Sequence, residues 1–288
     1  MILVTGTTGH LGSAVIKQLL KHTSANKIVA FARDEHKAKH LTEKGIEVRY
    51  GTFEDTYSLD GAMQGIEKVL LISTIDHHRL QQHKNVVDAA KRAGVKHILY
   101  TSASIKNVNT SAIKAIMESH FQTEDYIKRS GLKYTFLRNT LYTDVIPFYI
   151  GKKVLETGVF LPAGNGKVAY ALRREMGEAT ANALLQNGHE NKIYEITGSE
   201  LYSYEDVAKA LSELSGKSIA YTDIEPTKLS EQLKQAGNSE LVAAVIIGFA
   251  TDIKNHLFEI VSKDLENLLE RKPTALKEAL KELYNEVV

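Results

Sequence analysis

The chain has 288 residues, of which 43% are hydrophobic and 25% charged, and its formal net charge is +1. This length suits one large globular domain, or one domain with a smaller one attached, and the near-neutral charge gives no reason to expect a nucleic acid or an acidic membrane as partner. The absence of cysteine excludes disulfides, thiolate catalysis and zinc-ribbon sites. Since the first apolar run starts at residue 2 and the longest, 241–250, is too short to span a bilayer, we expect a cytoplasmic protein without a signal peptide.

Residues 2–20 combine an apolar run, a glycine loop and an amphipathic segment. Ile2-Leu3-Val4 predicts a buried strand, and apolar residues recur at helical spacing from Val15 to Leu20. Between them lie three regularly spaced glycines: Gly6, Gly9 and Gly12. In this context the first permits a tight turn, the second lets the backbone approach a pyrophosphate, and the third lets helix and strand pack closely. We therefore predict a dinucleotide site, in which free N–H groups around His10 and Leu11 hold phosphate charge, rather than an ordinary glycine-rich turn.

Strands and helices alternate through the rest of the N-terminal half. Apolar runs predict further strands at 27–32, 46–50, 68–72, 97–102 and 134–137. Helices are predicted between them, around Ala38 and Leu41 and at 58–65, 85–93 and 111–129. This alternation is typical of an α/β fold with a doubly wound parallel (Rossmann) sheet.

The pattern changes near residue 150. After it we predict, in order, a hairpin or loop at 158–166, a helix at 175–186, a strand at 192–197, a mostly helical region from 204 and a strand near 219–222. We expect the helix 175–186 and the strand 192–197 to return to the main sheet. The predicted organisation is thus an NAD(P)-binding Rossmann domain at 1–150 and a smaller, mixed α/β substrate cap at 151–288 that does not fold alone.

Arg33 stands at the end of the second predicted strand, where the ribose of the adenosine half lies in this fold. An acidic residue there hydrogen-bonds the 2′-hydroxyl of NAD, whereas an Arg accommodates the 2′-phosphate of NADP. Lys37 adds a second positive charge one helical turn further, while Asp34 would repel a phosphate. Alternatively, Arg33 and Lys37 form a solvated charged face. Because the acid that NAD requires is missing, we predict NADPH as the cofactor.

Short blocks along the whole chain carry a likeness to a known family. They are Thr5–Gly12 (TGxxGxxG), Arg33, Gln82–Val87, Ala93–Lys96, Tyr100–Ser102, Leu137–Asn139, Tyr194–Gly198 and Lys272–Leu276. The first resembles the fingerprint of atypical short-chain dehydrogenase/reductases, and the ordered set resembles the NmrA-like family, in particular its NADPH-dependent quinone oxidoreductases.

The resemblance implies a Rossmann domain that binds NADPH, a smaller C-terminal domain and a cleft for a quinone between them. It also implies that hydride passes directly, without flavin. The family often has an Asp after the third strand that contacts adenine, and the matching place here is Thr52, with Asp55 three residues on. This departure concerns the adenine contact and leaves the phosphate site intact.

The helix at 111–129 lacks the Tyr-x-x-x-Lys pair with which carbonyl reductases protonate an alkoxide, since Tyr126 is followed four residues later by Ser130. A ketone would lack its proton donor, whereas a quinone gives a much less basic hydroquinone anion that water can protonate. The absence favours a quinone-type acceptor, and it fits equally well a non-catalytic regulator that senses NADP(H). A reductase of another activated double bond, such as an enone or a dye-like cation, is a third hypothesis.

Side chains near the nicotinamide should come from the loops after the fourth, fifth and sixth strands. Asn139 and Tyr142 follow the sixth strand, and we select them for the cleft wall where a quinone hydrogen-bonds or stacks. His120 lies on the apolar face of its helix, so it is either a cofactor contact or a core histidine satisfied by a backbone carbonyl. These three are the catalytic candidates. His77 and His78 have no third ligand at metal spacing, so we predict no metal site.

The predicted cofactor-binding residues are Gly6, Thr8, Gly9, His10, Leu11, Arg33, Lys37, Ser73, Thr74, Thr101 and Ser102. The expected partner is a small-molecule quinone or a similar electron-poor acceptor, with no nucleic acid and no membrane. We also allow for a homodimer.

Overall fold

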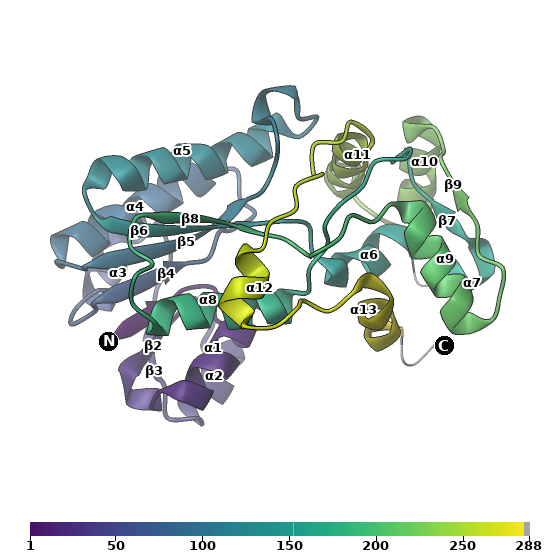
Figure 1. Cartoon of the computed structure of the whole chain (residues 1–288). Coiled ribbons are helices and arrows are strands. Elements are labelled where there is room, and N and C mark those ends of the chain that lie inside the picture. The colour runs from purple at the N-terminus through teal and green to yellow at the C-terminus, as the bar shows by residue number, and fades with distance from the viewer. Residues whose placement is uncertain (152, 285–288) are drawn as a thin grey trace.

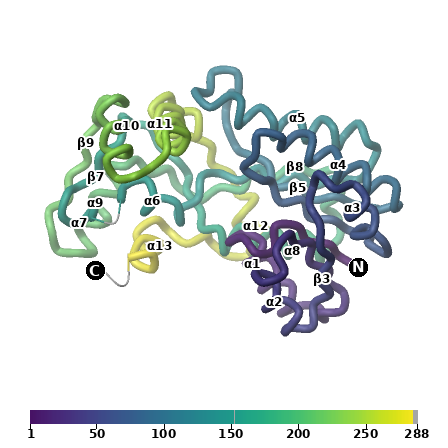
Figure 2. Tube along the Cα trace, turned by 180° about the vertical axis from the view of Figure 1, so that it is seen from behind, coloured from purple at the N-terminus to yellow at the C-terminus, as the bar shows by residue number. Residues whose placement is uncertain are grey.

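The computed structural model describes residues 1–151 and 153–284. Within these ranges no helix is long and apolar enough to cross a membrane. Two lobes lie side by side, one built around a large sheet and one mostly helical (Figure 1). The view from behind shows the same two lobes, with α11 (Glu240–Lys254) beside the start of α5 (Lys114–Ser130) (Figure 2).

The large sheet has seven strands that are all parallel, in the order β3-β2-β1-β4-β5-β6-β8. They are β1 (Ile2–Val4), β2 (Ile28–Ala32), β3 (Glu47–Tyr50), β4 (Lys68–Leu71), β5 (His97–Ala103), β6 (Lys133–Asn139) and β8 (Lys192–Ile196). Val4 of β1 pairs with Ala30 on one side and with Leu70 on the other. The strand order reverses at β1, which opens a crevice at the carboxyl ends of the strands. This confirms the predicted doubly wound fold.

Helices cover both faces of this sheet (Figure 1). One face carries α1 (His10–His22), α2 (Glu35–Thr42), α8 (Arg173–Leu185) and α12 (Asp264–Leu269), and the other carries α3 (Thr56–Ala62), α4 (Arg79–Arg92) and α5. Successive side chains of a strand point to opposite faces, so Leu3 packs with α3 and α4 while Val4 packs with α1 and α8. Both faces are therefore apolar, as a buried parallel sheet requires.

The second lobe has a hydrophobic core of its own. Its elements are α6 (Ile146–Ile150), α7 (Val154–Thr157), β7 (Val159–Phe160), α9 (Tyr204–Ser215), β9 (Tyr221–Thr222), α10 (Pro226–Gln235), α11 and α13 (Leu276–Leu283). The helix α8 and the strand β8 lie in the layers of the large sheet although they come later in the chain. The division into domains at residue 150 stays a prediction.

The segment 158–166, for which we expect a hairpin or a loop, forms a loop. β7 pairs in parallel with the distant β9, and the N–H of Gly166 donates to the carbonyl oxygen of Ala163 at 3.2 Å. A Cβ added to Gly166 would lie 1.7 Å from the carbonyl oxygen of Ile253. The glycine is therefore explained by the close approach of α11.

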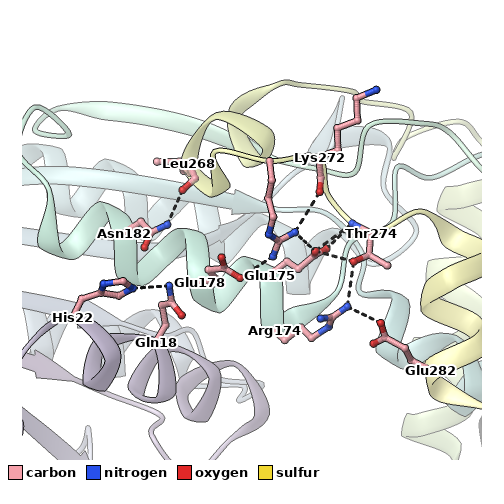
Figure 3. A network of polar contacts seen from close by, with 11 residues as sticks. Gln18, His22, Arg174, Glu175, Glu178, Asn182, Leu268, Lys272, Thr274 and Glu282 are labelled. Carbon is pink, nitrogen blue, oxygen red and sulfur yellow. Dashed lines mark hydrogen bonds and ion pairs between the residues drawn. The ribbon is translucent and has the colours of Figure 1, made fainter.

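A network around Glu175 ties the two lobes together (Figure 3). Glu175, 1% exposed in the first turn of α8, accepts hydrogen bonds from Arg271 Nη1 at 2.6 Å and from Thr274 Oγ1 at 2.8 Å. Arg174 Nη2 donates to Glu282 of α13 at 2.9 Å. The segment between α12 and α13, with the block Lys272–Leu276, is thereby held on the helix layer of the sheet.

Candidate functional site

The loop between β1 and α1 has the geometry of an anion site. Gly6 has a φ of +62°, which favours glycine, and a Cβ on Gly12 would lie 2.1 Å from the carbonyl oxygen of Gly6. Gly9 is the N-cap of α1 and has no side chain to cap it, so the N–H groups of His10 and Leu11 find no acceptor among the described residues. These free donors at a helix N-terminus suit a diphosphate.

A cleft of about 470 Å³ opens at this loop. Its lining residues come from the carboxyl ends of β1, β2, β3 and β4, the loops that follow them, and the helices α2 and α4: Gly6, Thr8, Gly9, Phe31, Ala32, Arg33, Lys37, Phe53, Glu54, Ile72, Ser73, Thr74, Ile75, Asp76 and Gln82. Seven of the predicted cofactor-binding residues are among them: Gly6, Thr8, Gly9, Arg33, Lys37, Ser73 and Thr74. His10, Leu11, Thr101 and Ser102 are not. His10 and Leu11 are the first two residues of α1, directly after the loop, and the side chain of Leu11 is buried in the core.

Arg33 and Lys37 are exposed cations on the β2 side of the cleft. Asp34, which would repel a phosphate, is used by the fold. It is the N-cap of α2, its Oδ1 accepts from the Lys37 N–H at 3.1 Å, and its Oδ2 lies 3.9 Å from Lys37 Nζ. The Asp34 carboxylate is thus directed at the first turn of α2. Its repulsion of a phosphate bound beside Arg33 is therefore weaker than the sequence alone suggests.

Ser73 and Thr74 follow β4 and are held in place by the neighbouring strand. The Ser73 N–H donates to Thr101 Oγ1 at 2.9 Å, so Thr101, 1% exposed, supports the cleft wall from behind. Ser102 is also buried, and its Oγ has no hydrogen-bond partner among the described residues.

The acidic residue that faces the cleft after β3 differs from the one that the sequence indicates. Asp55 is the N-cap of α3, and its Oδ1 accepts from the N–H groups of Tyr57 and Ser58 at 3.1 and 3.2 Å. The neighbouring Glu54 lines the cleft instead, together with Phe53. Sequence reasoning missed both residues, because neither belongs to the motif at this position.

His120 lies in the core between α4, α5 and β5 and does not line the cleft. Its Nε2 is 3.1 Å from Arg79 Nη1 and its Nδ1 is 2.9 Å from the hydroxyl of Tyr100. Burial and, next, the charge of Arg79 lower the pKa of His120 well below its ordinary value, so the ring is neutral. Since Arg79 only donates, the proton is on Nδ1 and points at Tyr100. Both nitrogens are occupied by side chains, rather than by the backbone carbonyl that we considered.

Arg79 is the residue of this region that the sequence did not reveal. It is 4% exposed, and besides His120 it donates to the carbonyl oxygen of Thr74 at 3.1 Å, to that of Ile116 and to Ser119 Oγ at 2.9 Å. It therefore pins the loop after β4 to α5. A buried Arg breaks an apolar pattern, so periodicity placed the start of α4 at residue 85 although it begins at Arg79.

Asn139 is the last residue of β6 and Tyr142 follows three residues later, and neither is among the residues that line the cleft. Asn139 is 6% exposed, and both of its amide atoms, Oδ1 and Nδ2, lack a hydrogen-bond partner among the described residues. Burial raises the pKa of Tyr142, and its contact with the Asn139 side chain acts in the opposite direction, although neither amide atom reaches hydrogen-bond geometry. The Tyr142 ring is covered by Arg173, whose Cζ lies 5.5 Å from its centroid. An unpaired buried amide is costly, and a ligand with matching groups would satisfy it.

His77 and His78 are exposed. Across residues 1–151 and 153–284, no group of three or more His, Asp or Glu side chains is placed to hold a metal ion.

Comparison with known proteins agrees with this geometry. The NmrA-like family matches residues 1–281. Quinone oxidoreductase 2 of Escherichia coli K12 is 37% identical over 292 residues, which cover 99% of each chain. The E. coli NADPH-dependent quinone oxidoreductase complexed with NADPH superimposes with a TM-score of 0.92, at 35% identity over 99% of this chain and all of the other. The Citrobacter sp. triphenylmethane reductase complexed with NADP(H) gives 0.92, at 36% identity over 98% of this chain and all of the other. Sequence and structure therefore agree that the chain belongs to the NmrA-like family.

Proposed function

We propose that this protein is an NADPH-dependent reductase that passes hydride to a quinone-type acceptor without flavin. The observation that carries the proposal is the cleft itself, in which an uncapped helix N-terminus and two cations surround a space at the point where the strand order reverses. Two similar proteins of known structure were solved with NADPH or NADP(H), and their names describe a quinone oxidoreductase and a triphenylmethane reductase.

Each part of the cofactor has a matching part of the chain. The N–H groups of His10 and Leu11, with Gly6, Thr8 and Gly9 around them, hold the diphosphate. Arg33 and Lys37 hold the 2′-phosphate, because no acid at the end of β2 is available for a free 2′-hydroxyl. Ser73 and Thr74, supported by Thr101, continue the wall toward β5, with Ser102 at its end. NADPH, when bound there, supplies the hydride.

Asn139 and Tyr142 form the acceptor end of the site. The unpaired amide of Asn139 donates to a carbonyl oxygen of the acceptor, and the Tyr142 ring gives it a flat apolar surface. The helix α5 lacks the Tyr-x-x-x-Lys pair of carbonyl reductases, and its Tyr126 donates its hydroxyl to Asp88 of α4 at 2.8 Å. A ketone would therefore lack a proton donor, whereas a hydroquinone anion takes its proton from water.

Binding and turnover test the proposal separately. Fluorescence titration should give a much lower dissociation constant for NADPH than for NADH. The Arg33→Ala variant should raise the NADPH constant about tenfold or more, because a charge-assisted hydrogen bond to phosphate is lost. Arg129→Ala, which removes an exposed cation of α5, is the matched control and should leave it unchanged.

Oxidation of NADPH with simple benzoquinones then tests catalysis. Turnover supports the reductase. Tight NADPH binding without reduction of any quinone or related electron-poor acceptor would contradict it and favour the sensing alternative, which equal affinities for NADP and NADPH would support.

A further inference from the structure

Arg173 is a cation at the acceptor end that the fold uses incompletely. It is the first residue of α8, and its backbone N–H donates to Asp144 Oδ2 at 2.8 Å. The side chain is 21% exposed and meets the same oxygen only at 3.7 Å from Nε, which has no hydrogen-bond partner among the described residues. Arg138 of β6, in contrast, donates twice to Glu124, at 2.9 and 2.7 Å. The guanidinium of Arg173 therefore keeps charge and donors that the fold does not satisfy.

The fold brings this cation to Tyr142 and Asn139. Tyr142 forms a β-bridge with Ala171, so the segment that leads into α8 lies beside the loop after β6. Two residues later, Arg173 lies over the Tyr142 ring, with Cζ 5.5 Å from the ring centroid. The Asn139 side chain also contacts Tyr142, and it is 6% exposed with no partner at either amide atom among the described residues. A cation and an unpaired amide thus meet at one aromatic ring.

The cluster of Arg173, Tyr142 and Asn139 lies where an acceptor would meet the cofactor. In the sheet order β1-β4-β5-β6, it belongs to the carboxyl end of β6. The glycine loop follows β1, and a dinucleotide bound at the switch point extends from there along the same edge. With the adenosine half on the β2 side at Arg33, the nicotinamide end lies toward β5 and β6. The acceptor must bind next to that end, because reacting atoms have to approach closely.

Hydride transfer places negative charge on the acceptor. A quinone that takes one hydride from NADPH gains two electrons and becomes a hydroquinone anion, NADP is left, and the anion then takes one proton from water. A hydroquinone is a phenol, and a phenol such as the tyrosine side chain has an ordinary pKa of about 10, so the anion is costly at neutral pH. A cation within about 4–6 Å, or a donor already aimed at the oxygen, lowers that cost without reorganising during the reaction.

We propose that Arg173, held over Tyr142, stabilises the hydroquinone anion together with the amide of Asn139. This inference rests on the proposed reductase function. Asn139 Nδ2 donates to the oxygen that becomes negative, and Arg173 supplies the balancing positive charge beside it. Asp144 has the opposite sign and limits this effect, but its Oδ2 is already engaged by the N–H at the start of α8. The site thereby favours acceptors that become anions on reduction, as quinones do.

The test measures how strongly the site prefers a phenolate to a phenol. The probe is 4-nitrophenol, a product analogue whose phenolate is yellow and whose phenol is not, bound to protein saturated with NADP. An absorbance titration against pH gives the pKa of the bound probe. Arg173→Gln should raise that pKa by about one unit relative to the wild type, whereas Arg173→Lys keeps the charge and should raise it much less. Asp144→Asn keeps an oxygen for the α8 N–H and removes the opposing charge, so it should lower the pKa.

Arg174→Gln is the matched control, because it makes the same charge change one residue away. The Arg174 side chain is directed to Thr274 and Glu282 (Figure 3). The control should keep the wild-type pKa of the bound probe. Equal thermal unfolding temperatures should show that all variants are folded.

Three results would overturn the role of Arg173. They are no binding of 4-nitrophenol by the wild type, the same bound pKa in Arg173→Gln as in the wild type, and an equal shift in Arg174→Gln. Failure of the wild type to reduce any quinone with NADPH would instead overturn the proposed function, whatever the probe shows.

Discussion

Asn139 and His120 are both buried polar residues near the carboxyl end of the sheet, and they differ in what their polar atoms meet. His120 has a partner at each ring nitrogen, Arg79 on one side and Tyr100 on the other. Asn139 has none at either amide atom. A buried polar group whose hydrogen bonds are complete is explained by the fold, whereas one left incomplete calls for a water or a ligand to complete it. On this comparison we assign His120 to the core and Asn139 to the proposed acceptor site.

The largest effect on NADPH binding is expected from Gly12, because the glycine loop positions the backbone N–H groups that would hold the diphosphate. In Gly12→Val the new Cβ would meet the carbonyl oxygen of Gly6 at 2.1 Å, so the loop must move. The N–H groups of His10 and Leu11 would then no longer converge on a diphosphate. We expect the NADPH dissociation constant to rise about a hundredfold or more, which is the loss of two charge-assisted hydrogen bonds. Undiminished NADPH binding in a folded variant would refute the phosphate site.

Matched substitutions of Asn139 and His120 by Leu separate binding from folding. Asn139→Leu removes no hydrogen bond of the fold, so the free energy of unfolding should change by less than about 1 kcal/mol while kcat/KM for a quinone falls about tenfold. His120→Leu removes one hydrogen-bond partner from Arg79 and one from Tyr100, both buried, which should cost about 3 kcal/mol of unfolding free energy. The value of kcat/KM should stay nearly unchanged at temperatures where the variant is folded. Urea unfolding and quinone kinetics measure the two effects. The opposite pattern would exchange the roles of the two residues.

The smallest effect concerns acid stability and extends the comparison to His83, which is fully buried beside Tyr100. Burial, with a smaller contribution from Arg79, lowers the pKa of His83 to about 3. The folded state keeps the ring neutral while the unfolded chain takes up a proton below pH of about 6.5. Its contribution to stability is therefore complete above that pH and is lost as the pH falls toward 3. His83→Gln should reduce the slope of unfolding free energy between pH 6 and 4 by about 1 kcal/mol per pH unit. Parallel slopes would show that His83 titrates normally.

The parallel sheet and the glycine loop between β1 and α1 were predictable because they depend on local patterns. Apolar runs predict the strands. The spacing of Gly6, Gly9 and Gly12 can be interpreted from the neighbouring residues alone. Seven of the predicted cofactor-binding residues line one cleft for the same reason, since the carboxyl ends of parallel strands share an edge.

The parts that were not predictable depend on partners distant in the chain. Arg79 is buried because its acceptors lie at Thr74, Ile116 and Ser119, and no local pattern indicates them. Glu54 faces the cleft because Gln82 reaches it from another helix, while the adjacent Asp55 is used to cap α3. Likewise, the pairing of β7 with β9 and the approach of α11 to Gly166 each join segments that are far apart in sequence.

The contacts of Glu175 have a consequence for motion. The chain passes between the lobes several times, and this carboxylate fastens one of those passages, through Arg271 and Thr274, to a helix of the sheet. A second lobe that is tethered in this way is poorly suited to rotate as a whole about a single hinge. Heating should accordingly melt both lobes in one cooperative transition, and admission of a small molecule should rely on side chains and short loops rather than on opening of the whole cap.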